Sequence, residues 1–149
     1  MYRVVLDPIV MLRGLLNPHS ICGCLFFDYA DRYRAFFSDA TVSALHLLIY
    51  NPFVVMALTH LTKTNPRQVE RLLLRAERVR IPKDLRGNIF VAVALTAHAD
   101  YVICEDAVIR AKCKERAVPV LTASEFVSLL APEHFSEPEP AVGVGGSQP

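Results

Sequence analysis

The chain has 149 residues, of which 52% are hydrophobic and 21% charged. This length and composition predict a single domain with a sizeable core. Sixteen Lys and Arg residues against 15 Asp and Glu residues give a formal charge of +1. Net charge therefore favours neither a nucleic-acid-binding nor a membrane-surface protein, and any site for a polyanion must be a local patch.

The N-terminal run YRVVL, residues 2–6, is typical of a buried strand, and it is followed by Asp7 and Pro8. A carboxylate next to such a run must be paired or lie at the solvent-facing end of the strand, because burying an unpaired charge is costly. One interpretation is that Asp7 caps a helix whose first residue is Pro8. The other is that Asp7 is a functional group at a strand tip.

Further along the chain, short β-branched or aromatic runs predict strands at 34–38, 78–81, 101–104 and 118–121. Helical patterns lie between them, with starts predicted at Ser20, at Asn65 and at Thr122, and an apolar helix over 88–99. Strands separated by helices require crossover connections and therefore a parallel sheet. We expect a three-layer α/β sandwich with four or five parallel strands flanked by helices.

The composition changes near residue 131. Residues 1–131 carry the strand and helix patterns, whereas residues 132–149 are rich in Pro, Gly and Glu. Such a segment cannot bury a core, so we expect one folded domain over 1–131 and a disordered tail over 132–149.

The most membrane-like segment, residues 42–58, is 17 residues long and contains His46 and the turn-forming pair Asn51-Pro52. It predicts two packed helices and no membrane span. The four cysteines form no Cys-x-x-Cys motif. We expect them to be reduced, in a cytoplasmic protein.

Two acids follow predicted strands directly. Asp7 follows the first strand, and Asp106, with Glu105 beside it, follows the run YVIC. Ligands of parallel α/β sheets bind at the carboxyl ends of the strands. Two carboxylates there begin a site for a hard cation such as Mg²⁺, which prefers oxygen ligands.

Three segments resemble a known family. VVLDPIVMLRGLLNPHS, GNIFVAVALTAHADYVICEDAVI and VPVLTASEFVSLL are similar, in order and spacing, to blocks of the PIN-domain family, in its branch of toxins from toxin–antitoxin pairs. The resemblance covers residues 2–130. It implies a parallel sheet flanked by helices, and a Mg²⁺- or Mn²⁺-dependent ribonuclease in active members.

The resemblance also implies a set of metal-binding acids at the carboxyl edge of the sheet. Asp7 and Asp106 match the first and fourth of these acids, whereas the second falls at Ala44 and the third at Asn88. Two further family positions, an accessory Asp and the Thr-Asn pair after the first Asp, are occupied by Val108 and by Pro8-Ile9. Half of the metal-binding box is missing.

Other residues offer partial substitutes. Asn88 can present a neutral carbonyl oxygen, and Glu105 or Asp84 can complete the ligand shell, whereas Asp39 is expected to cap a helix. If the chain is an enzyme, we expect Asp7, Asp106 and Asn88 to be catalytic, and Asp7, Asp106 and Glu105 to hold Mg²⁺ or Mn²⁺.

Two functions remain open. The favoured one is a catalytically degenerate PIN domain that binds RNA or an antitoxin-like protein; the alternative is an active or weak Mg²⁺/Mn²⁺-dependent ribonuclease toxin. The apolar side chains of segment 41–62 must be buried, either inside the domain or against a second subunit. We expect a homodimer. Arginines at 67, 71, 75 and 78 are interpreted as a solvated helix face or a phosphate-contacting stripe.

Overall fold

The computed structural model describes residues 1–57, 59–60, 76–82 and 87–132. Its strands form one parallel sheet in the order β3-β2-β1-β4-β5. The strands are β1 (Tyr2–Leu6), β2 (Tyr33–Phe37), β3 (Glu77–Arg78), β4 (Tyr101–Ile103) and β5 (Val120–Leu121). The helices are α1 (Pro8–Leu16), α2 (Ile21–Phe27), the 3-10 turn Ala30–Arg32, α3 (Asp39–Ile49), α4 (Pro52–Ala57), α6 (Ile89–Ala97), α7 (Ala107–Glu115) and α8 (Ala123–Leu130).

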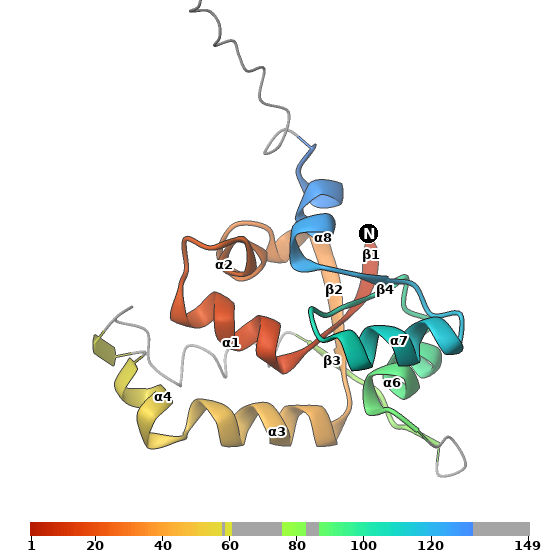
Figure 1. Ribbon diagram of the computed structural model, residues 1–149, viewed down its shortest axis with the longest axis horizontal. Helices are drawn as coiled ribbons and strands as arrows, with labels where there is room; N and C mark the ends of the chain where they lie inside the picture. Colours follow the sequence, from red (N-terminus) through yellow and green to blue (C-terminus); the bar gives the residue numbers. More distant parts are fainter. Residues whose placement is uncertain (58, 61–75, 83–86, 133–149) are drawn as a thin grey trace, which may run out of the picture.

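Helices cover both faces of the sheet, as Figure 1 shows. Successive strand residues point to opposite faces, so Val4 and Leu6 pack against α1, α2, α3 and α8, whereas Val5 packs against α6 and α7. Each face therefore has its own apolar core. The predicted three-layer α/β sandwich with a parallel sheet is confirmed.

The order of the strands creates a switch point at the centre of the sheet. From β1 the chain runs outward to β2 and β3, and it then returns to β4 on the other side of β1 before reaching β5. Adjacent connections leave β1 and β4 in opposite directions, and parallel α/β sheets commonly bind their ligands at the carboxyl ends of such a strand pair. Asp7 follows β1, and Cys104 follows β4, at this position.

Most predicted element starts are confirmed, with one correction. Ser20 caps α2, and Thr122 and Glu125 form a reciprocal capping box on α8. The expectation that Asp39 caps α3 is wrong: Ser38 is the cap, because its Oγ accepts the N–H of Thr41 at 3.1 Å. The helix predicted from Asn65, most of the arginine stripe, Asp84 and the C-terminal tail lie outside the described residues.

None of the described helices alone has both the length and the apolar character that crossing a bilayer requires. Taken together, α1 and α2 reach that length and composition, but they meet at an angle of 92°.

Candidate functional site

Asp7 both caps a helix and lies at a strand tip. Its Oδ1 accepts the backbone N–H of Ile9 at 3.0 Å, which caps α1, and Pro8 occupies the first helical position. Its Oδ2 accepts a hydrogen bond from the Cys104 thiol at 3.2 Å. Only 4% of the residue is exposed. Asp7 is therefore a helix cap, as one interpretation of the sequence predicts, and it lies at the tip of β1, where its other oxygen bonds the Cys104 thiol.

Cys104 connects the two acids predicted from the sequence. Its fully buried thiol donates to Asp7, and its Sγ accepts the backbone N–H of Asp106 at 3.3 Å. Burial, reinforced by the hydrogen bond to Asp7, raises the pKa of the Cys104 thiol to about 12. The group is therefore a neutral donor at physiological pH.

The sequence interpretation missed this role. Cys104 lies in an apolar run, and a free cysteine in such a run usually behaves as a small hydrophobe. The signal that would have found it is the register of the sheet: Leu6 pairs with Ile103, so the next residues of the two strands, Asp7 and Cys104, lie side by side.

Asp106 is exposed and caps α7. Its Oδ1 accepts the backbone N–H groups of Val108 and Ile109 at 2.8 and 3.1 Å. Its own N–H contacts the thiol that is bonded to Asp7, so the backbone of Asp106 and the carboxylate of Asp7 both contact Cys104.

Asn88 has a third capping role. Its Oδ1 accepts the N–H groups of Phe90 and Val91 at 2.9 and 3.4 Å, at the start of α6. Among the hydrogen bonds of the described residues, none joins Asn88 to Asp7 or Asp106. Its side-chain oxygen is thus committed to the helix terminus.

Glu105 points to a different part of the fold. Its Oε2 accepts the N–H of Ala123 at 2.7 Å, which ties the end of β4 to the start of α8. Its charge also contributes, after burial, to raising the pKa of Cys22 on α2. The structure therefore does not bring the carboxylate of Glu105 to Asp7 and Asp106, where the metal hypothesis needs it.

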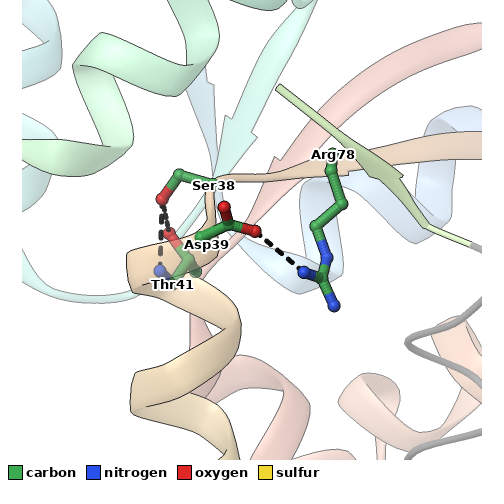
Figure 2. A network of polar contacts seen from close by, with 4 residues as sticks. All are labelled: Ser38, Asp39, Thr41 and Arg78. Atoms are coloured by element: carbon green, nitrogen blue, oxygen red, sulfur yellow. Dashed lines mark hydrogen bonds and ion pairs between the residues drawn. The ribbon is translucent and has the colours of Figure 1, made fainter. Parts of the chain in front are cut away.

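A separate polar network lies where β2 and β3 end. Figure 2 shows the side chain of Arg78 reaching Asp39, with 2.8 Å between Nη1 and Oδ1, while the hydroxyls of Ser38 and Thr41 lie 2.9 Å apart. The network joins β3 to the start of α3. Ala44, at the family's second acid position, is an exposed residue of the same helix and supplies no polar group.

The donor chemistry at the switch point does not fit a Mg²⁺ or Mn²⁺ site. Within the ranges that the structure describes, no three His, Cys, Asp or Glu residues are grouped so as to hold a metal ion. A thiol, which Mg²⁺ does not favour, contacts the two carboxylate residues, and each of those carboxylates caps a helix.

Exposed apolar side chains gather on α3 and α4. Leu47, Phe53 and Met56 are 75%, 80% and 57% exposed, and Tyr50 at the junction of the helices is 42% exposed. Leu47 and Tyr50 are three residues apart at the end of α3, and Phe53 and Met56 are three residues apart on α4, so each pair can share a face of its helix. We call these four residues the α3–α4 stripe.

No protein-family model and no curated protein matches this chain. The PIN resemblance therefore rests on the sequence blocks described above, together with a fold of the kind they imply.

Proposed function

We propose that this chain is a PIN-like domain that has lost two of its four catalytic acids and serves as a binding module. The proposal rests on the hydrogen bonds made by the polar side chains at the carboxyl edge of the sheet. Asp7, Asn88 and Asp106 each cap a helix, and the second oxygen of Asp7 accepts the Cys104 thiol. These contacts stabilise the fold without requiring a metal.

Electrostatics favours the same conclusion. A unit charge about 4 Å from a monovalent cation is worth about 4 kcal/mol at an effective dielectric constant of about 20, before desolvation is subtracted. Ala44 and Asn88 each lack a charge that the resemblance expects. Loss of two carboxylates should therefore weaken the binding of a divalent ion by orders of magnitude.

The binding surface that we assign to the module is the α3–α4 stripe. Scattered exposed apolar residues are ordinary, but four of them on two consecutive short helices are a candidate interface. A second copy of the chain is the proposed occupant, and an antitoxin-like protein is the competing one. Single-stranded RNA is the ligand that the PIN resemblance implies.

The alternative, a weak Mg²⁺- or Mn²⁺-dependent ribonuclease, is favoured by one specific feature. The carboxylate of Asp7 and the backbone N–H of Asp106 contact the same thiol at the topological switch point, so two of the four expected acids belong to neighbouring strand ends. In that case Asn88 or Glu105 would have to leave its helix terminus to complete the shell.

Titration calorimetry with Mn²⁺ distinguishes these functions. The unmodified chain should bind Mn²⁺ weakly, and Asp7→Asn should change the binding little. Ala44→Glu combined with Asn88→Asp should strengthen binding by at least tenfold, because two charges return to the carboxyl edge. Tight binding by the unmodified chain that Asp7→Asn abolishes would support the ribonuclease instead.

A further inference from the structure

The outer side of α3 carries an open hollow with a volume of about 490 Å³. The α3 residues that line it are three or four positions apart in pairs, so they share one side of the helix. The buried residues Thr41, Leu45 and Ile49 lie on the other side. We call this feature the α3 hollow, and it is lined by Val42, Ser43, His46, Leu47 and Arg78.

The α3 hollow adjoins the α3–α4 stripe. Leu47 belongs to both. The rings of His46 and Tyr50 have their centroids 4.6 Å apart, so a second residue of the hollow contacts a residue of the stripe. Phe53, which follows Pro52 at the start of α4, is 80% exposed. The chain therefore carries a hollow and an exposed aromatic side chain on two consecutive helices.

The walls of the hollow suit an aromatic ring. Arg78 is half-exposed, and its Nη1 lies 2.8 Å from Oδ1 of Asp39, which holds the guanidinium beside the first turn of α3 (Figure 2). A guanidinium attracts the electron-rich face of an aromatic ring, and an imidazole such as that of His46 packs against one. Two aliphatic side chains of the hollow add apolar contact area. This environment matches a phenylalanine side chain better than a small polar one.

We propose that Phe53 of a second copy of this chain occupies the α3 hollow. In a two-fold symmetric dimer both copies present the same surface, so each Phe53 enters the hollow of its partner. A second copy is the occupant because it carries, on the same two helices, both the hollow and the ring that fits it. Antiparallel packing of the two α3 helices, with the symmetry axis near Leu48, midway in sequence between Ser43 and Phe53, meets this condition.

An aromatic anchor in a pocket is the usual source of binding energy at such an interface. The pairing rests on the proposed use of the α3–α4 stripe as an interface between copies, and it specifies which side chain enters which site.

Sedimentation equilibrium of the full-length protein tests this pairing. Phe53→Ala should raise the dissociation constant of the dimer by about tenfold or more, because it removes the anchor. Ser43→Trp should have a similar effect, since Ser43 is exposed and the larger side chain fills the hollow without entering the core. Combining the two changes should add little, because both remove the same contact. Ser124→Trp, at an exposed serine of α8, is the matched control and should leave the dissociation constant unchanged.

Disulfide cross-linking identifies the neighbours directly. The background is Cys22→Ser, because Cys22 is half-buried whereas the other three thiols are buried. With Ser43→Cys and Phe53→Cys in the same chain, air oxidation at high protein concentration should give a covalent dimer. Mass spectrometry should then show position 43 of one copy joined to position 53 of the other, and neither single variant should form the covalent dimer.

Two results separate this pairing from the proposed dimer itself. If the unmodified protein is a dimer but Phe53→Cys alone forms the cross-link, or if the effects of Phe53→Ala and Ser43→Trp are fully additive, the stripe is an interface and the pairing is wrong. If the unmodified protein is a monomer at high concentration, the proposed dimer interface fails, and the pairing fails with it.

Discussion

The Sγ atom of Cys104 lies 3.2 Å from Oδ2 of Asp7, although the two residues are 97 positions apart in the chain. The contact joins the carboxyl ends of two central strands at the topological switch point. Because Asp7 is nearly inaccessible to water, the thiol replaces a hydrogen bond that the carboxylate would otherwise make with solvent.

The first prediction tests this hydrogen bond. Cys104→Ala should lower the free energy of unfolding by about 1–3 kcal/mol, because it leaves Oδ2 of Asp7 without its donor and opens a small cavity. Cys104→Ser should cost less, since a hydroxyl can still donate to Asp7. Urea unfolding followed by circular dichroism measures both.

Cys113 is the matched control for this comparison. It is also fully buried, and it belongs to the apolar core that α6 and α7 form with the sheet. There a hydroxyl has no carboxylate to bond, so Cys113→Ser should be at least as destabilising as Cys113→Ala. If the Ser and Ala variants rank in the same order of unfolding free energy at both positions, the contact of Cys104 with Asp7 contributes nothing to stability.

The second prediction concerns alkaline pH. Burial raises the pKa of Cys104 to about 12, from an ordinary value near 9, and raises the pKa of the other three thiols. A pKa that is higher in the folded state adds stability that is complete below the unfolded value and is lost as pH rises through the folded value. Stability should therefore fall between about pH 9 and pH 12, and Cys104→Ser should make that fall shallower. A pH-independent urea midpoint from pH 8 to 10.5 would contradict this.

The third prediction concerns association through the α3–α4 stripe. Leu47→Lys or Phe53→Lys should turn a dimer into a monomer without loss of stability, because both side chains are largely exposed in the isolated chain. Light scattering during gel filtration measures the mass. Leu48→Lys is the control: that residue is half-buried within α3, so its substitution should destabilise the fold itself. If the unmodified protein is a monomer at high concentration, the α3–α4 stripe is not a dimer interface.

Much of the fold could be predicted from local patterns. The run YRVVL has the length and β-branched content of a strand, and Thr122 with Glu125 has the spacing of a capping box. The boundaries of the elements are harder to predict. Ser38, and not Asp39, caps α3, and Ser and Asp are about equally favoured as N-caps, so the sequence does not distinguish these neighbours. A two-residue strand such as β3 is defined by its partner more than by its own sequence.

The site was predictable only in part. That Asp7 and Asp106 follow neighbouring strands at one edge of the sheet is expected from the rule that parallel strand ends meet at that edge. The contact of Cys104 with Asp7 depends on the register between strands 97 residues apart, which no local pattern contains. The direction of Glu105 depends likewise on where α8 begins in space.

We propose that the two missing carboxylates, at Ala44 and Asn88, have silenced a ribonuclease site. The most direct measurement is the cleavage of fluorescent single-stranded RNA in Mn²⁺ by the unmodified chain, by Ala44→Glu/Asn88→Asp, and by that double variant with Asp7→Asn added. We expect no cleavage by the unmodified chain, cleavage by the double variant, and loss of that cleavage when Asp7→Asn is added. Robust metal-dependent cleavage by the unmodified chain, abolished by Asp7→Asn alone, would contradict it.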